Sequence, residues 1–233
     1  MNEVHPVVSC DICTEFEALE RNVQEPFSMA ANAKEWDARH REAAQNSPAE
    51  PASIVSEWLP LLPVGAALDL ACGTGRHALM LAARGQFVNA VDWSGSALDI
   101  LESRALTAKL PVSRADGASY TRSRAHGIRL IQANLEDNQL PEALFSLILC
   151  LQYLQRSLFQ QIAAALRPGG VLVFETFTRA QLNHSGGPRN PDHLLESGAL
   201  RTAFPGLHTL FYRELNAGQG IASLVAQKPP KIG

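Results

Sequence analysis

The sequence predicts an α/β fold in which a mostly parallel β-sheet is covered by helices on both faces. The first observation behind this prediction is that apolar runs typical of buried strands alternate with helical patterns between residues 66 and 177. The second is that the last two apolar runs, residues 207–215 and 221–228, are separated by a short linker rich in Gly and Asn, which is typical of a hairpin. We therefore expect α/β alternation that ends in an antiparallel pair of strands.

The order of the elements follows from local signals. Residues 33–44 are strong helix formers, and a second helix reaches Trp58 before two prolines end it. Gly85 is placed to close one central helix, and Ser94 has the side chain of an N-cap for the next. The expected strands are residues 66–71, 87–92, 128–134, 144–151 and 171–177, and the expected helices between them are residues 77–84, 97–108 and 156–166.

In the remaining stretches the apolar residues do not recur with the period of a helix or a strand. Residues 1–30 are expected to form a tail, and residues 31–233 one domain in which residues 31–62 supply N-terminal cap helices. Residues 107–127 are rich in Arg, Ser and Gly and are expected to be an insertion, either a solvated surface loop or a flap that contacts an anionic substrate. Residues 178–200 form a polar loop region after the last parallel strand.

Composition and charge exclude several classes of partner. A net charge of −3 and a pI near 6.2 give no overall basic field, so neither a nucleic acid nor a membrane is expected as a partner. No apolar run approaches the roughly 20 residues of a membrane span, and the N-terminus is too polar for a signal peptide. We expect a cytoplasmic protein that is a monomer or a homodimer.

The cysteines predict neither a disulfide framework nor a metal site. Four cysteines in 233 residues are too few for a disulfide scaffold, and Cys72 and Cys150 fall at strand ends where thiols are usually buried and reduced. Cys10 and Cys13 form a C-x-x-C pair, but zinc needs about four ligands and only His5 lies nearby. Two incidental thiols are therefore the expected interpretation.

The stretch ALDLACGTGRH, residues 67–77, carries the clearest functional signal. A buried strand that contains Asp69 breaks into a turn with Gly73 and Gly75 just before a helix begins. The glycines allow the backbone to approach a ligand closely, and the free N–H groups of the first helical turn can hold a polar group. Asp92 ends the next parallel strand, where a carboxylate can accept both hydroxyls of a ribose. The pattern predicts a site for a nucleoside cofactor.

The same glycines leave a nicotinamide cofactor as an alternative. Gly73, Gly75 and Ala78 satisfy G-x-G-x-x-A, the pattern of an NAD-type oxidoreductase. Asp69 argues against it, because a carboxylate ahead of the turn could hold a cationic ammonium group but would repel a pyrophosphate. The chain also lacks a second mononucleotide-binding half and a Tyr-x-x-x-Lys pair.

In their order and spacing, five motifs resemble the class I S-adenosylmethionine-dependent methyltransferases. The motifs are LDLACGTGRH, AVDWS, QANLED, FSLILCLQYL and LRPGGVLVFETF, and they lie within roughly residues 65–178. EWDARHR and the ETFT…GGPRNPDHLL segment further resemble small bacterial methyltransferases of the tellurite-resistance type, TehB-like enzymes. The resemblance implies a Rossmann-like three-layer αβα sandwich, with a seven-stranded, mostly parallel sheet that ends in an antiparallel hairpin. It also implies methyl transfer from S-adenosyl-L-methionine, with S-adenosyl-L-homocysteine as product.

The resemblance implies roles for individual residues. Those that would bind the cofactor are Asp69, Ala71, Gly73 and Gly75 at the methionine end, Asp92 at the ribose, Trp93, Asn134 and Leu135 at the adenine, and Cys150 beneath the sulfonium. Asn134 would otherwise cap a turn, and Cys150 would otherwise pack in the core. Trp36, with Arg39 or Arg41, could lie across the cofactor as a lid, although simple packing of Trp36 on the domain is the alternative.

The acceptor side is expected after the fifth parallel strand. His184, Arg189 and His193 lie there and would bind or deprotonate a small polar or anionic acceptor, although loop chemistry is the alternative. Residues 150–153, CLQY, stand where enzymes that methylate amide or exocyclic amino nitrogens carry an Asn/Asp-Pro-Pro-aromatic motif. We therefore expect a thiol, oxygen or metalloid acceptor, with a ring nitrogen left open. The other alternative is a non-catalytic protein that binds S-adenosylmethionine.

Overall fold

The structure, a computed structural model, describes residues 50–231 of the 233-residue chain. Several predictions fall outside the described residues, namely the tail over residues 1–30, the helix over residues 33–44, the Cys10 and Cys13 pair, Trp36 and Arg39. The described part begins just before helix α3, Ser53–Trp58, which belongs to the predicted cap region over residues 31–62.

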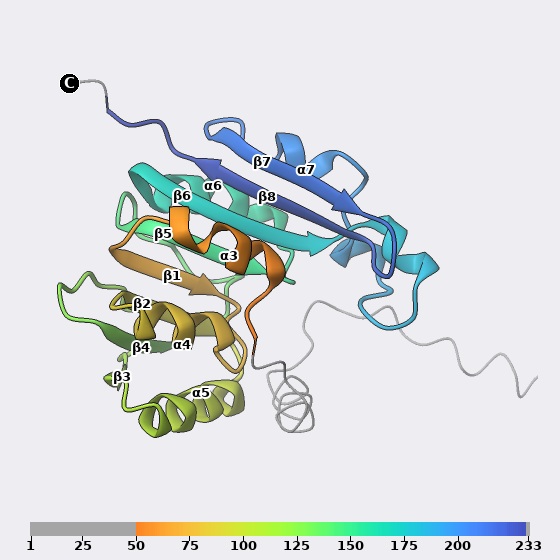
Figure 1. Ribbon diagram of the computed structural model, residues 1–233. Helices are drawn as coiled ribbons and strands as arrows, with labels where there is room; N and C mark the ends of the chain where they lie inside the picture. Colours follow the sequence, from red (N-terminus) through yellow and green to blue (C-terminus); the bar gives the residue numbers. More distant parts are fainter. Residues whose placement is uncertain (1–49, 232–233) are drawn as a thin grey trace, which may run out of the picture. The chain divides into compact units, whose positions relative to one another are not determined.

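Within residues 50–231 the strands form one sheet of eight, in the order β3-β4-β2-β1-β5-β6-β8-β7 (Figure 1). β8 is antiparallel to both of its neighbours, β6 and β7, and the other pairs are parallel. The strands are β1 Ala66–Leu70, β2 Phe87–Asp92, β3 Val112–Arg114, β4 Gly127–Gln132, β5 Phe145–Leu151, β6 Leu166–Phe177, β7 His208–Leu215 and β8 Ile221–Gln227. A dinucleotide-binding sheet has a second parallel half where this sheet has its antiparallel hairpin, so the topology argues against an NAD-type oxidoreductase.

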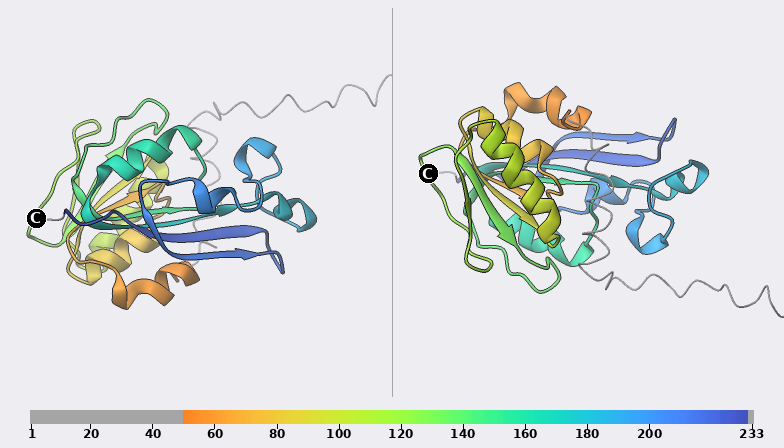
Figure 2. Two further views of the ribbon diagram at one scale, coloured as in Figure 1. Left: turned by 90° about the horizontal axis from the view of Figure 1, so that it is seen from above. Right: turned by 90° about the horizontal axis from the view of Figure 1, so that it is seen from below.

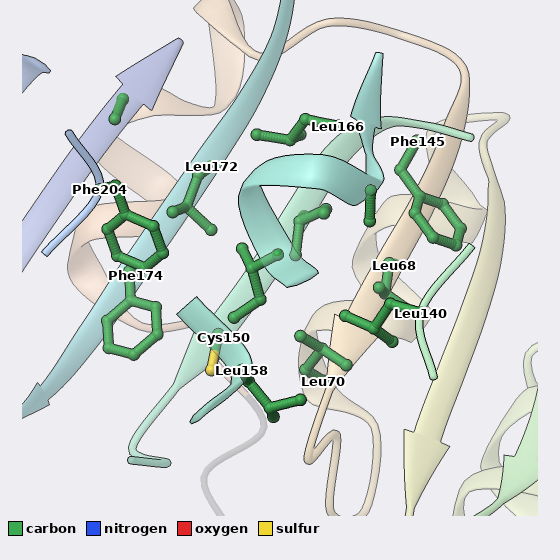
Figure 3. Close-up of a cluster of buried hydrophobic side chains, with 14 of the residues drawn as sticks. Leu68, Leu70, Leu140, Phe145, Cys150, Leu158, Leu166, Leu172, Phe174 and Phe204 are labelled. Atoms are coloured by element: carbon green, nitrogen blue, oxygen red, sulfur yellow. The ribbon is translucent and has the colours of Figure 1, made fainter. Parts of the chain in front are cut away.

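Helices cover both faces of the sheet and produce two apolar clusters. α3, α4 and α5 pack on one face and α6 and α7 on the other, and Figure 2 shows α3 and α4 opposite α6. Phe174 of β6 and Phe204 lie ring to ring at 5.5 Å between centroids on the α6 face (Figure 3). The remaining helices are α4 Arg76–Ala83, α5 Gly95–Thr107, α6 Phe159–Ala165 and α7 Ala199–Thr202, with short 3-10 turns η2 Leu59–Leu61, η3 Arg156–Leu158, η4 Arg179–Asn183 and η5 Pro191–His193.

Strand ends and helix ends largely follow the sequence signals. Ser94 accepts a hydrogen bond from the Ala97 N–H at 3.0 Å and so caps α5, and Gly85 follows α4 with φ +84°. β6 is an exception, because it begins at Leu166 and not at Val171. The pairing with β5 shifts register between these two residues, so a bulge stands where the sequence predicts only the end of a helix.

The segment over residues 107–127 differs from the predicted insertion, because part of it adds a strand to the sheet. Val112–Arg114 forms the edge strand β3, which is the eighth strand where seven are predicted. Asn89 in β2 holds the following loop, since its amide donates to the Thr121 carbonyl at 2.9 Å and accepts from the Thr121 N–H at 3.0 Å. Asn89 is fully buried, so the loop covers the sheet in place of a helix.

Replacing Asn89 with Ala should destabilise the protein by about 2–4 kcal/mol, because the Thr121 N–H and carbonyl would lose their partner at the surface of the sheet. Urea unfolding followed by circular dichroism measures the change. Ser119→Ala, at an exposed position of the same loop, is the control and should change the free energy of unfolding by less than about 0.5 kcal/mol. Equal stability of the two variants would show that Asn89 does not anchor the loop.

Candidate functional site

The predicted cofactor residues within residues 50–231 lie at or near the carboxyl ends of β1, β2, β4 and β5. Gly73 and Gly75 lie in the turn between β1 and α4 with φ +53° and +81°, a backbone conformation that favours glycine. A Cβ at Gly75 would lie 2.1 Å from Leu101 Cδ1 on α5, so α5 closes the space behind the turn. Ala71, also predicted to bind the cofactor, has φ +52°, which is strained for a residue with a side chain.

Asp92 ties the glycine turn to the end of β2. Its Oδ2 accepts from the Gly73 N–H at 2.7 Å, and its Oδ1 accepts from the Ser94 N–H at 2.8 Å. The side chain is largely buried, at 8% exposed. A carboxylate has about four acceptor positions, and these two bonds occupy two of them. The structure thus places a fixed carboxylate at the tip of β2, as the sequence predicts.

Asp69 is a buried carboxylate beneath the same turn. It lies in the middle of the sheet on β1, is 1% exposed, and its Oδ2 has no hydrogen-bond partner among the described residues. Burial raises the pKa of Asp69 from 3.8 to about 7; the Ala78 N–H and Arg76 counteract this, and Asp92 adds to it. An unpaired carboxylate oxygen in this position is suited to an ammonium group.

His77 and Arg76 complete the start of α4. His77 is buried, and its Nε2 accepts from the Ala52 N–H at 3.1 Å, which connects α4 to the residue that precedes α3. Burial and the nearby Arg76 lower the pKa of His77 to about 3, so the imidazole is neutral. His77 therefore acts as a structural acceptor.

The predicted adenine residues lie after β2 and β4. Trp93 is half-buried next to Asp92, and its carbonyl accepts from Gln132 at 3.2 Å. The Asn134 side chain is used within its own turn, because Oδ1 accepts from the Glu136 N–H at 3.1 Å and Nδ2 donates to Asp137 at 2.9 Å. Leu135 is buried at the centre of this turn.

At the end of β5, Cys150, which is predicted to lie beneath the sulfonium, is buried, whereas Gln152 is exposed. Cys150 points into the apolar cluster on the α6 face, close to Leu158 (Figure 3). It is 1% exposed, and burial raises the pKa of its thiol. Gln152, two residues later, is exposed and has φ +59°, so the strain seen at Ala71 recurs at the end of the adjacent strand.

The three predicted acceptor-side residues lie in the segment after β6 but differ in their contacts. His184 Nε2 lies 2.9 Å from the Asn216 carbonyl, and Arg189 donates to the carbonyls of Leu182 at 2.8 Å and His184 at 2.6 Å. These two side chains hold the segment together. The His193 imidazole is half-buried at the end of η5 and makes no hydrogen bond to any described residue.

Arg156 connects this segment to the loop after β5. Its guanidinium donates to the carbonyls of Asp192 and Leu194, both at 2.8 Å. His193 lies between these two residues, so the position of His193 depends on Arg156. The sequence gives no signal for this role of Arg156, because an arginine at the start of a short helix is usually exposed.

The sequence motifs also did not predict a group of polar and charged side chains on the α3 face of the sheet. Glu175 of β6 and Ser223 of β8 are register partners, and the Ser223 hydroxyl donates to the Glu175 carboxylate at 2.6 Å. Ser223 is paired in turn with Arg213 of β7, whose Nε and Nη2 are buried without a hydrogen-bond partner in the described part of the chain. Burial raises the pKa of Glu175, and Arg213 counteracts this. A carboxylate inside the apolar run VLVFETF is the signal that could have found it.

No group of three or more potential metal ligands among residues 50–231 could hold a metal ion. No helix in this part of the chain is long and apolar enough to cross a membrane.

Comparisons with known proteins agree with this geometry. Residues 68–174 match the family model of the methyltransferase domain, whereas no curated protein sequence matches the chain. Among solved structures, the chain is similar to one from work on the conversion of a disulfide bond into a thioacetal group in echinomycin biosynthesis, with 17% identity, TM-score 0.62, and coverage of 86% of this chain and 94% of that chain.

Two other solved structures have the same fold. An S-adenosylmethionine-dependent methyltransferase from Mesorhizobium loti is 19% identical, with TM-score 0.59 and coverage of 78% of this chain and 99% of that chain. TehB from Haemophilus influenzae is 14% identical, with TM-score 0.62, and the match covers 80% of this chain but only 65% of TehB. Residues 68–174 therefore match a methyltransferase domain and the chain has the fold of S-adenosylmethionine-dependent methyltransferases, which together imply S-adenosylmethionine as the cofactor.

Proposed function

We propose that the protein transfers the methyl group of S-adenosylmethionine to a small-molecule thiol, oxygen or metalloid nucleophile. The observation that carries the cofactor part is the pair of carboxylates at the glycine turn. Asp92 is held by two backbone N–H groups at the tip of β2, and Asp69 has an unpaired buried oxygen below the turn. We assign the first to the ribose hydroxyls and the second to the ammonium of the methionine moiety, because their positions at the end of β2 and below the turn support these roles.

The fit of the residues supports this cofactor over one with a pyrophosphate. A buried carboxylate such as Asp69 would repel a diphosphate but attracts the cationic end of an amino acid. S-adenosylmethionine, when bound, supplies a methyl group already activated by its sulfonium. The chain then has to align the acceptor, exclude water and, where needed, accept a proton.

Of the three predicted acceptor-side residues, His193 is the one whose contacts best support a role in binding the acceptor. His184 and Arg189 use their side chains to hold backbone carbonyls, whereas the His193 imidazole has no such bond to the described residues. An imidazole whose nitrogens have no partner among the described residues can bind or deprotonate a small acceptor. The formal net charge of −3 argues against a polyanionic acceptor, because the protein has no overall basic field to attract one.

Calorimetric titration with S-adenosylmethionine, S-adenosylhomocysteine and NAD tests the cofactor part directly. Micromolar binding of the first two, and none of NAD, is the expected result. Thiols, metalloid oxyanions and small phenols are then screened for formation of S-adenosylhomocysteine. Binding without turnover for any acceptor would favour a non-catalytic S-adenosylmethionine-binding protein, and binding of NAD alone would overturn the proposal.

The affinity for S-adenosylhomocysteine should rise about tenfold between pH 6 and pH 8, because a carboxyl with a pKa near 7 is about one-tenth ionised at the lower pH. The ammonium of the ligand favours the ionised form, so the affinity increases with pH. In Asp69→Asn this dependence should vanish. 5′-Methylthioadenosine, which lacks the amino acid, serves as the control ligand, and its affinity should not follow the same curve.

His193→Ala should lower kcat/KM at least tenfold for the best acceptor of the screen, because a group that binds or deprotonates the acceptor is lost. The affinity for S-adenosylhomocysteine should not change. His208→Ala, an exposed histidine at the start of β7, is the matched control. Unchanged kinetics in both His193→Ala and Arg189→Ala would remove this segment from the acceptor site.

A further inference from the structure

Four residues other than glycine among residues 50–231 have a positive φ, and two of them lie at the carboxyl ends of neighbouring strands. Ala71, with φ +52°, directly follows β1, and Gln152, with φ +59°, directly follows β5. The other two are Lys109, which follows the C-terminal end of α5, and Ala143, which precedes β5. A positive φ is unfavourable for a residue with a side chain, and residues strained in this way cluster at functional sites.

β1 and β5 lie side by side where the order of the strands along the sheet reverses (Figure 1). The strands β2, β3 and β4 lie on one side of β1, and β5 and all later strands lie on the other. In open α/β sheets, ligands bind outside the carboxyl ends of the strands at such a reversal. Ala71 and Gln152 therefore flank the position expected of a ligand. With the ribose assigned to Asp92 at the tip of β2, the end of β5 is left for the acceptor.

The backbone contacts of Gln152 do not require a glutamine. Its N–H donates to the Glu175 carbonyl at 2.7 Å, which continues the pairing of β5 with β6 beyond the register pair Leu151 and Glu175. Glycine would make the same bond and would adopt this φ without strain. The side chain of Gln152 is exposed, and its amide makes no hydrogen bond to any described residue. What glutamine adds at this position is therefore an amide that a ligand can reach.

We propose that Gln152 binds the methyl acceptor through its side-chain amide and selects acceptors with a hydroxyl group. The amide is uncharged and offers both N–H donors and a carbonyl acceptor, which a hydroxyl group matches in both respects. A thiol is a weak donor and a weak acceptor, so it gains less from the same contact. Gln152 thus favours an oxygen acceptor over a sulfur acceptor. The inference rests on the proposed methyl transfer, for which it names one determinant of the acceptor.

Gln152 orients the acceptor and does not deprotonate it, because an amide is not a base at ordinary pH. During transfer the acceptor oxygen forms a bond to the methyl carbon while the bond from that carbon to sulfur breaks. The hydroxyl proton passes to a base, for which His193 is the candidate of this site. The contribution of Gln152 is therefore to hold the oxygen in line with the methyl group.

The test measures kcat/KM for the best phenol of the acceptor screen and for the thiophenol with the same ring substituents. Gln152→Met keeps the length of the side chain without its hydrogen bonds, and Gln152→Gly also removes the strain. In both variants kcat/KM should fall about tenfold or more for the phenol and less than about threefold for the thiophenol. The affinity for S-adenosylhomocysteine should not change. The melting temperature of Gln152→Gly should equal that of the wild type or exceed it by up to about 2 °C.

Lys109→Gly is the matched control, because Lys109 is exposed and has φ +56° but follows α5. It should relieve similar strain and leave kcat/KM for both acceptors unchanged. Unchanged kinetics in the folded Gln152 variants, or equal losses for phenol and thiophenol, would overturn the inference. A wild-type protein that methylates thiols or metalloids but no phenol would overturn it and leave the proposed function in place. Methylation of no acceptor at all would overturn both.

Discussion

Asp92→Ala is expected to weaken the binding of S-adenosylmethionine by two to three orders of magnitude. The proposed hydrogen bonds from both ribose hydroxyls to the carboxylate would be lost, and a hydrogen bond to a charged group contributes about 1.5–3 kcal/mol. The Gly73 and Ser94 N–H groups would also lose their common acceptor, so the turn itself would relax. Isothermal titration calorimetry with S-adenosylmethionine measures the effect.

Asp99→Ala provides the matched control for the loss of a carboxylate. Asp99 lies on α5, pairs with Arg114 at 2.5 Å and has a side chain that is 71% exposed. Its removal should leave cofactor affinity unchanged within a factor of about two, because a surface ion pair contributes little. If Asp92→Ala bound the cofactor as well as Asp99→Ala, Asp92 would not be the ribose ligand.

Gly75→Ala is expected to destabilise the protein by about 3–5 kcal/mol and to abolish cofactor binding. An alanine at φ +81° costs about 1–2 kcal/mol, and a methyl group 2.1 Å from Leu101 Cδ1 forces the turn or α5 to move. Because Gly75 is the N-cap residue of α4, such a movement displaces the first helical turn, where the cofactor is expected. Thermal unfolding and titration with S-adenosylmethionine measure the two effects.

Gly85→Ala separates the conformational cost from the steric one. Gly85 follows the other end of α4 with φ +84°, but no atom lies within 4 Å of a Cβ placed there. This variant should lose only about 1–2 kcal/mol and should bind the cofactor normally. Equal losses in the two variants would mean that Leu101 does not confine the turn.

The sequence predicts those parts of the fold that depend on local signals. The strand–turn–helix around Gly73 and Gly75 and the cap at Ser94 are encoded by a few adjacent residues, and the structure contains them. The antiparallel final pair is equally local, since only five residues separate β7 from β8. Each of these features depends on residues close together in the chain.

Features that depend on contacts between distant segments could not be predicted in this way. The strand Val112–Arg114 is only three residues long, and the loop that follows it is fixed by Asn89, 32 residues from Thr121. Asn89 lies within an apolar strand, where its amide gives no indication of its partner. In the candidate site, Arg189 is predicted to face an acceptor, whereas its guanidinium binds two backbone carbonyls. The roles of all the predicted site residues remain predictions.

The bonds from Arg156 to Asp192 and Leu194 have a consequence for how an acceptor would be selected. The segment that carries His193 is already hydrogen-bonded to the loop after β5, so little conformational freedom remains for an incoming molecule to remove. When an acceptor binds against this segment, the entropic cost of ordering the segment is therefore small, and a small molecule with few contacts can still bind. The same rigidity favours acceptors whose shape matches the surface of this segment and disfavours acceptors that require the segment to move.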